Sequence, residues 1–130
     1  MLLVPTRVAP SAIHGLGLFA GQFIARGSLI WRFAPEFDQE FSPEQFLQLP
    51  LPTQAHTRWF GFVNAESGHW ILSGDHACFM NHSPAPNTGA SPDSPTPITT
   101  VALRDITIGE EITCDYFAFD AHASRKLGLL

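Results

Sequence analysis

The sequence predicts a mainly β domain of short strands and long loops, with one small helix. Its 130 residues include eleven prolines and ten glycines, which favours turns and short strands over long helices. Several short apolar segments are rich in aromatic and β-branched side chains, the composition that suits a pleated, half-buried surface. Apolar residues make up 45% of the chain and charged residues 15%. We therefore expect one globular domain over residues 1–130 with a core of its own.

The predicted strands follow one another along the chain with turns between them. Near the start, a short strand over residues 2–8 is broken at Pro5, and residues 11–20 are predicted to form a turn that enters a strand. Gly68 is expected to turn a hairpin between two later strands, and Gly109 turns the chain into the last one. The other strand candidates are 29–33, 59–64, 70–73, 98–103 and 111–116, with a loop over 90–97 and a tail over 117–130 that ends in a helical turn or frays.

One short helix is predicted within an insert at about residues 34–58. Residues 42–45 combine a serine cap, a first-turn proline and a glutamine at the reciprocal capping position. Pro50 and Pro52 are expected to end this helix near Leu49.

The same insert alternates acidic and aromatic side chains. This pattern fits an acidic rim that attracts a basic substrate, and it also fits an ordinary solvated face, which is the simpler interpretation. The acidic residues concerned are Glu36, Asp38, Glu40 and Glu44.

Charge and composition argue against several classes of function. The formal net charge of −5 is unlike that of a general phosphate-backbone binder but compatible with a basic polypeptide partner, so no direct nucleic-acid binding is expected. No apolar run approaches the roughly 18 to 20 residues of a membrane helix. Because the first residues lack the basic region of a secretory signal, we expect a cytoplasmic protein that does not enter membranes.

The sequence contains no pattern typical of a metal site or of a serine hydrolase. Cys78 and Cys114 are the only cysteines, too few for a four-thiolate zinc site, and are interpreted as reduced thiols rather than a disulfide. The six histidines show no metal-binding spacing, so no metal site is predicted. The adjacent pair His82 and Ser83 lacks a Gly-x-Ser-x-Gly elbow and is not arranged as a catalytic triad.

Three segments, in a fixed order, carry the functional signal. The first is the tight turn Gly15-Leu16-Gly17, which on its own is weak evidence. The second is residues 79–88, in which Phe-Met is followed by Asn-His-Ser, two prolines and Asn-Thr. The third is residues 109–116, with the sequence Gly-Glu-Glu-Ile-Thr-Cys-Asp-Tyr. Together they resemble the three signatures of the SET-domain protein-lysine methyltransferases. The resemblance implies a minimal, stand-alone SET domain, with small curved sheets, a knot-like C-terminal threading and one or two short helices.

The resemblance also implies a cofactor, S-adenosyl-L-methionine, and a protein lysine as the acceptor. The residues that would contact the cofactor are Gly15, Leu16, Gly17, Asn81, His82 and Phe117, with Phe119 and Leu127 as further candidates to cover its adenine. Tyr116 would be catalytic and, with Cys114, would line the lysine channel. Asn87 would bond backbone where the C-terminal segment is threaded.

Methyl transfer to an amine sets physical requirements that these residues can meet. A lysine ammonium, with an unperturbed pKa near 10.4, must lose a proton before it attacks a methyl group. A narrow apolar channel favours the neutral amine, so a strong general base is not obligatory. Tyr116 offers an aromatic wall and a hydroxyl for such a channel, although a core tyrosine with a satisfied hydroxyl would have the same sequence.

Two departures from the family pattern leave a rival function open. Cys78 stands where many members have arginine, and Cys114 stands where many have phenylalanine or tyrosine. The smaller Cys114 predicts room for higher methylation states. The rival is a catalytically weak SET-like module that binds the cofactor or a basic peptide without turnover. Further expectations are a basic, histone-like or other protein substrate, a homodimer, and association with the nucleoid or host chromatin through that substrate.

Overall fold

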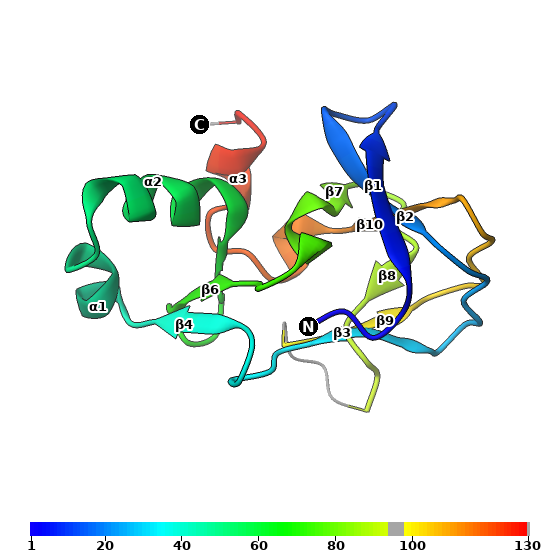
Figure 1. Ribbon diagram of the computed structural model, residues 1–130, viewed down its shortest axis with the longest axis horizontal. Helices are drawn as coiled ribbons and strands as arrows, with labels where there is room; N and C mark the ends of the chain where they lie inside the picture. The colour runs from blue at the N-terminus through cyan, green and yellow to red at the C-terminus, as the bar shows by residue number, and fades with distance from the viewer. Residues whose placement is uncertain (94–97, 130) are drawn as a thin grey trace.

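Three small β-sheets form the frame of the protein (Figure 1), in a computed structural model that describes residues 1–93 and 98–129. The first sheet has the strand order β1 (Thr6–Pro10), β2 (Leu16–Ala20), β10 (Glu111–Cys114) and β7 (Asn81–His82). The second has the order β3 (Leu29–Arg32), β9 (Thr99–Ala102) and β8 (Thr88–Gly89). The third has the order β4 (Gln39–Phe41), β6 (Trp70–Leu72) and β5 (Phe62–Val63). The prediction of a mainly β fold with small sheets and short helices is confirmed.

Most predicted strands form in the expected places, although several differ at their ends. Strand β1 begins only after Pro5, and Leu2 makes an isolated bridge with Trp31 instead of a strand. Strand β10 ends at Cys114 because Asp115 caps a 3-10 helix, η2 (Tyr116–Ala118), by accepting a hydrogen bond from the Phe117 amide at 3.0 Å. The chain therefore leaves the sheet immediately before Tyr116. Of the predicted loop at 90–97, residues 94–97 lie outside the described part of the chain.

The predicted helix forms as α1 (Pro43–Leu47), with Ser42 and Gln45 closing a capping box. It ends at Leu47, before Pro50 and Pro52, as expected, but a ten-residue helix that was not predicted, α2 (Leu51–Phe60), follows at once. Pro50 is its N-cap residue, and Pro52 lies in its first turn, where the missing amide hydrogen costs nothing. The strand predicted from residue 59 is accordingly reduced to β5.

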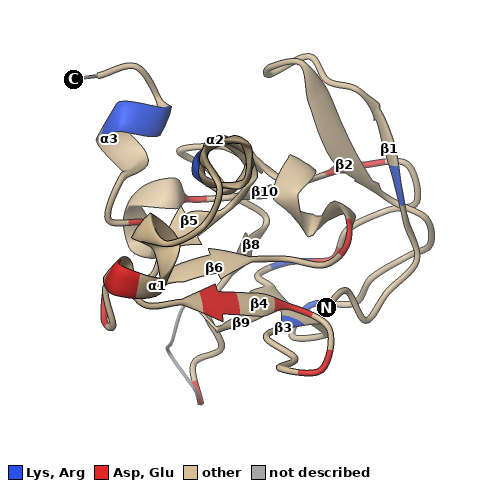
Figure 2. Ribbon diagram, turned by 60° about the vertical axis from the view of Figure 1, so that its left-hand side comes forward, with Lys and Arg blue, Asp and Glu red and all other residues tan. Residues whose placement is uncertain are grey.

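The acidic residues of the insert do not share one environment. Asp38 is only 4% exposed and accepts hydrogen bonds from the Ala34 and Gly74 amides, each at 2.9 Å. It therefore holds the turn before β4 and takes no part in an acidic rim. The other predicted acids, Glu36, Glu40 and Glu44, are exposed, and Figure 2 shows acidic segments on α1 and β4.

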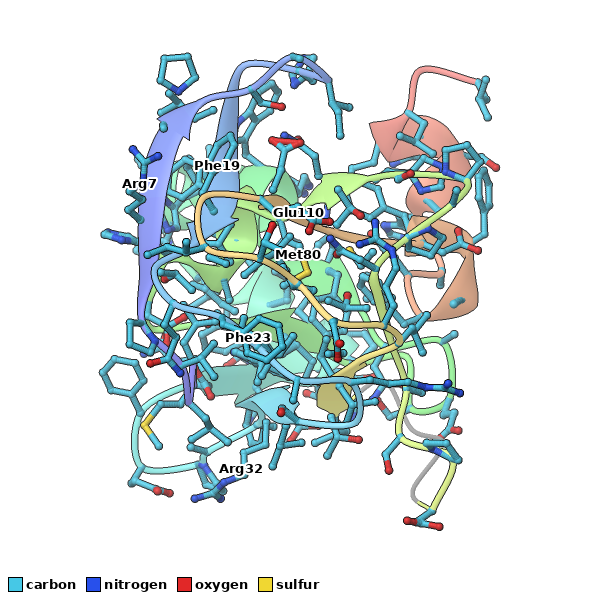
Figure 3. All side chains as sticks on the ribbon, turned by 90° about the vertical axis from the view of Figure 1, so that its right-hand side faces the viewer. Arg7, Phe19, Phe23, Arg32, Met80 and Glu110 are labelled. Atoms are coloured by element: carbon cyan, nitrogen blue, oxygen red, sulfur yellow. The ribbon has the colours of Figure 1, made fainter. Side chains whose placement is uncertain are left out.

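The core lies between the first two sheets and is almost entirely aliphatic. Its largest fully buried side chains are Leu18, Ile24, Ile30, Ile106 and Ile112, and Met80 packs against them (Figure 3). On the outer face, the guanidinium of Arg7 lies 5.8 Å from the centre of the Phe19 ring. Burial of one such aliphatic side chain contributes about 1.5–3 kcal/mol, so this cluster sets how the first and second sheets stack.

Asn87 joins the segment after β7 to β10 from within the core. It is 1% exposed, its Oδ1 accepts from the Thr113 amide at 2.8 Å, and its Nδ2 donates to the Glu111 carbonyl at 2.8 Å. The side chain thus acts as a strand partner for β10, as predicted for a backbone-bonding asparagine. The knot-like threading itself stays a prediction.

Asn87→Ala is expected to lower the free energy of unfolding by about 2–4 kcal/mol, because it leaves a buried amide and a buried carbonyl without partners. Urea unfolding followed by circular dichroism measures this change. The control is Gln39→Ala at an exposed strand position, expected within about 0.5 kcal/mol of the parent. A similar small change for Asn87→Ala would contradict the structural role of its two hydrogen bonds.

Candidate functional site

The glycine loop and the Asn-His segment, far apart in sequence, are joined by one side chain. Asn81 is buried in β7, and its Nδ2 donates to the carbonyls of His14 and Leu16, each at 3.1 Å. These two bonds hold the loop around Gly15 against the end of the first sheet. The predicted cofactor residues of both segments therefore lie together.

Two glycines in this loop are required by geometry. Gly15 has a φ of 48°, in the left-handed region that favours glycine. A Cβ on Gly17 would lie 2.0 Å from Oε1 of Glu111, so no larger residue fits there without displacing that carboxylate. Within the described residues, this Glu111 oxygen is buried and has no hydrogen-bond partner.

The third segment reaches the same place through a parallel strand pair. Thr113 pairs with Asn81, and Cys114 pairs with His82. The Tyr116 amide then donates to Nδ1 of His82 at 3.1 Å, so Nε2 carries the proton of the neutral imidazole. The same Nδ1 lies 3.6 Å from a carboxylate oxygen of Asp115, which would pair with the charged ring. His82 therefore connects the second and third motifs.

Two aromatic rings pack against this histidine. The ring of His82 has its centre 5.4 Å from that of Tyr116 and 5.5 Å, edge to face, from that of Phe117. Phe117 is 53% exposed, which leaves much of its ring available to another flat group.

Tyr116 combines features of a packed core tyrosine and of a tyrosine that lines a substrate channel. Its hydroxyl donates to the Met80 carbonyl at 2.8 Å, as a packed core tyrosine would do. Its ring nevertheless lines a cavity, and burial raises its pKa well above the usual range. The phenol therefore stays protonated at any physiological pH, and its oxygen lies next to the residue that precedes Asn81.

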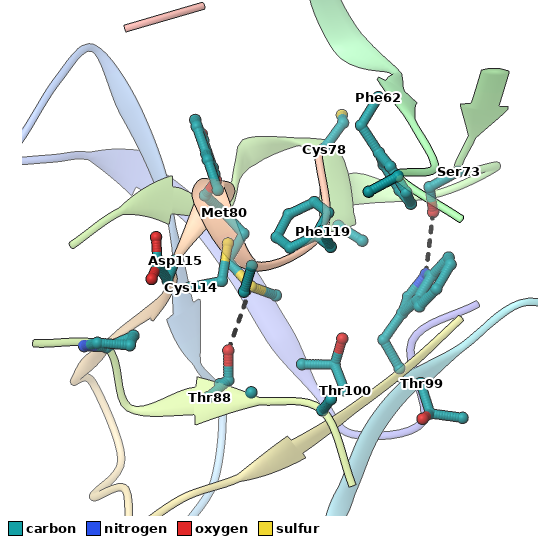
Figure 4. A pocket seen from close by; sticks show the side chains of 18 of the residues that line it. Phe62, Ser73, Cys78, Met80, Thr88, Thr99, Thr100, Cys114, Asp115 and Phe119 are labelled. Atoms are coloured by element: carbon teal, nitrogen blue, oxygen red, sulfur yellow. Dashed lines mark hydrogen bonds between the residues drawn. The ribbon is translucent and has the colours of Figure 1, made fainter. Parts of the chain in front are cut away.

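The cavity beside Tyr116 has a volume of about 390 Å³ (Figure 4). Its wall includes the small side chains of Cys78 and Cys114 and the larger ones of Met80 and Phe119. Burial raises the pKa of Cys114 to about 12 and also raises that of Cys78. Both thiols are therefore neutral at physiological pH and act as small apolar wall groups, not as nucleophiles.

The predicted site residues form two groups, one lining the cavity and one behind its wall. Cys114 and Tyr116, predicted for the substrate channel, line the cavity. The cofactor residues predicted from the motifs do not line it and gather instead around Asn81 and His82, whereas Phe119, a further candidate for the adenine, does line it. Because Cys114 pairs with His82 and Tyr116 packs on it, those two residues separate the motif cluster from the cavity.

Sequence reasoning missed the cavity residue Phe62, which follows the insert, and assigned Phe119 of the tail to the adenine instead of to the cavity. Phe62 on β5 packs edge to face on Phe119 at 5.0 Å, and both line the cavity. The tail is held there by Asp120, whose Oδ1 accepts from the Val63 amide at 3.2 Å. No motif contains these residues. The only sequence signal was the aromatic character of the tail, from which Phe119 was singled out for the adenine.

Within residues 1–93 and 98–129, no three His, Cys, Asp or Glu side chains gather closely enough to hold a metal ion. None of the helices in this part of the chain is long and apolar enough to cross a membrane.

The fold and the site together define a class of protein: a small β domain with a glycine loop, a parallel Asn-His strand and a half-buried phenol at the wall of a mainly apolar cavity. A family profile described as SET domain matches residues 15–117. The chain belongs to the SET-domain family.

Solved structures of the same fold include histone-modifying proteins. A humanized mutant of the Chaetomium thermophilum Polycomb Repressive Complex 2, bound to the inhibitor GSK126, matches with a TM-score of 0.67 and 21% identity over 94% of this chain and 16% of that chain. ctPRC2 in an autoinhibited conformation bound to S-adenosylmethionine matches with a TM-score of 0.65 and 19% identity, over 96% of this chain and 16% of that one. The Neurospora SET domain protein DIM-5, a histone lysine methyltransferase, matches with a TM-score of 0.57 and 18% identity, over 88% of this chain and 53% of that one.

These likenesses establish the fold of the chain. The chain spans only 16% of the two Polycomb chains, and all three identities are low. A search of curated proteins gave no match to the sequence.

Proposed function

We propose that the protein transfers methyl groups from S-adenosyl-L-methionine to lysine side chains of a basic protein. The observation that carries the proposal is the place of Tyr116. Its ring forms a wall of the cavity, and its hydroxyl lies on the carbonyl that directly precedes Asn81, the residue that holds the glycine loop. One phenol thus lies between a loop cluster suited to a cofactor and a cavity suited to an acceptor side chain.

The loop cluster fits a cationic cofactor. The buried, unpaired Glu111 oxygen beside Gly17 favours positive charge, and S-adenosyl-L-methionine carries an ammonium and a sulfonium. We assign its binding to Gly15, Leu16, Gly17, Asn81 and His82, with Phe117 offering an exposed ring for the adenine. The cofactor, when bound, supplies the electrophilic methyl group.

The cavity residues would prepare the acceptor amine. Apolar groups such as Met80 and Phe119 disfavour an ammonium and so lower the pKa of an entering lysine. The protonated Tyr116 hydroxyl, with its oxygen fixed by Met80, can accept a hydrogen bond from the amine and orient its lone pair. No side chain needs to act as a strong base, because the proton can leave to water before the amine enters.

The charge of the surface favours a basic substrate. The exposed acids Glu36, Glu40 and Glu44 lie on the insert (Figure 2), and Glu66 lies at the cavity itself. Together with the net charge of −5, they would attract a lysine-rich segment and raise its rate of encounter.

A methylation assay with labelled cofactor and a panel of basic proteins, including histones, tests this proposal. Transfer to lysine by the parent protein and its loss in Tyr116→Phe are the expected results. Isothermal titration with the cofactor, run in parallel, identifies the rival function. Tight binding with no transfer to any protein in the panel or in a lysate from the source cell would favour the catalytically weak module and contradict the proposal.

The size of Cys114 predicts the number of methyl groups transferred. Cys114→Phe would place a ring in the cavity wall, so we expect mass spectra to shift from di- and trimethylated toward monomethylated product. Cys114→Ser, which keeps the volume, is the control and should leave the distribution unchanged. A parent protein that stops at one methyl group would contradict this prediction.

A further inference from the structure

The only lysine of the chain lies at the cavity that we propose for substrate lysines. Lys126 is in the last turn of α3 (Ala123–Lys126) and lines the cavity together with Tyr116 and Cys114. Its side chain is 27% exposed. The neighbouring Arg125 is exposed and does not line the cavity.

Three contacts hold the ammonium of Lys126 at this place. Nζ donates to the Gly61 carbonyl at 2.5 Å and pairs with Oδ2 of Asp120 at 3.2 Å. It also lies 5.6 Å from the centre of the Tyr116 ring, over the aromatic face. Gly61 ends α2, where helix carbonyls without partners favour a cation.

The positive charge of Lys126 influences the pKa of the thiols in the cavity wall. Burial raises the pKa of the Cys114 thiol to about 12, and the nearby positive charge of Lys126 opposes that rise. The Cys78 thiol, on another part of the wall, is affected in the same way. A lysine side chain of this chain therefore already projects toward the groups that would surround an acceptor.

We infer that Lys126 is a methylation site modified by its own chain. The inference rests on the proposed function, because the methyl donor is the same cofactor. Rotation of the flexible four-carbon stem moves Nζ from Gly61 and Asp120 toward the Tyr116 hydroxyl. The ammonium first releases a proton to water. A bond then forms between the nitrogen and the methyl carbon, and the carbon–sulfur bond breaks with its electron pair left on sulfur as a thioether.

The reaction is favoured by proximity and limited by protonation. An amine tethered beside the site has a high effective concentration, so it reacts without a binding step. Only the neutral amine can attack the methyl group, so we expect slow modification that accelerates as the pH rises. The methylated amine keeps its positive charge and can pair with Asp120 again.

Mass spectrometry of the protein incubated with labelled cofactor alone tests the inference. We expect methylation of the peptide 126–130, released by cleavage after Arg125, and none in Lys126→Arg. The double variant Arg125→Lys with Lys126→Arg moves the lysine to the neighbouring exposed position. Because that position does not face the cavity, it should remain unmodified; equal labelling of the two lysines would overturn the inference.

Mixing two variants tests whether the reaction stays within one chain. Lys126→Arg retains the proposed catalytic residues without the acceptor, and Tyr116→Phe retains the acceptor without the phenol. We expect no labelled Tyr116→Phe protein in the mixture, and a modified fraction in the parent that is independent of protein concentration. Transfer between the two variants would overturn the assignment to one chain.

A measurement without cofactor tests the position of the amine. Because Lys126 is paired and partly buried, an amine-acylating reagent should modify it several-fold more slowly than the lysine at position 125 of the double variant. Equal rates would contradict the placement. Methylation of a basic protein with Lys126 left unmodified would overturn only this inference, whereas cofactor binding with no transfer to any lysine would overturn the proposed function as well.

Discussion

Tyr116→Phe is expected to lower the rate of lysine methylation by at least about 100-fold. Loss of one positioned polar group at a reacting centre typically costs 10²–10³ in rate, and here the hydroxyl is the group we assign to the acceptor amine. The ring that lines the cavity is retained, so acceptor binding should change little. Single-turnover assays with saturating cofactor measure the methyl-transfer step directly.

The same substitution separates catalysis from stability. It removes the hydrogen bond to the Met80 carbonyl, which contributes only about 1 kcal/mol to folding. The free energy of unfolding and the cofactor affinity should therefore remain close to the parent values. A rate reduced by less than about fivefold, in a folded variant that binds the cofactor, would show that the Tyr116 hydroxyl has only the structural role.

Replacement of Asn81 is expected to have its largest effect on cofactor binding. Asn81→Ala removes both hydrogen bonds to the His14 and Leu16 carbonyls. At about 1 kcal/mol each, their loss predicts binding of S-adenosyl-L-methionine weakened roughly 10- to 50-fold. Asn81→Asp should be worse, because a carboxylate would face the same two carbonyls. Isothermal titration gives the affinities, and hydrogen exchange at residues 14–17 reports whether the loop is released.

Asn87→Ala is the matched control for this experiment. It also removes a buried asparagine that bonds to backbone, but its partners are in β10 and not in the glycine loop. At a temperature where it remains folded, it should bind the cofactor with near-parent affinity. If Asn81→Ala binds the cofactor as tightly as Asn87→Ala does, the glycine loop does not need Asn81 for cofactor binding.

Local sequence rules succeeded where one segment alone decides the structure. The capping box at 42–45 predicted α1, and segments rich in aromatic and β-branched residues predicted most strands. They missed α2, because a proline that ends one helix is equally suited to begin the next. Asp38 was misjudged for a related reason: its burial depends on amides of Ala34 and Gly74, which no local pattern reveals.

The ordered motifs determined, without any coordinates, the family, the mainly β fold and the residues around Asn81, His82 and Tyr116. That was possible because glycine conformations and a short series of specific side chains are local properties of the chain. The tertiary structure alone decided the cavity, since its wall combines Tyr116 and Cys114 with Phe62 of β5 and Lys126 of α3. These contacts depend on how α3 packs on η2 and reaches the end of α2. Packing between segments that are distant in the sequence cannot be predicted from any one of them.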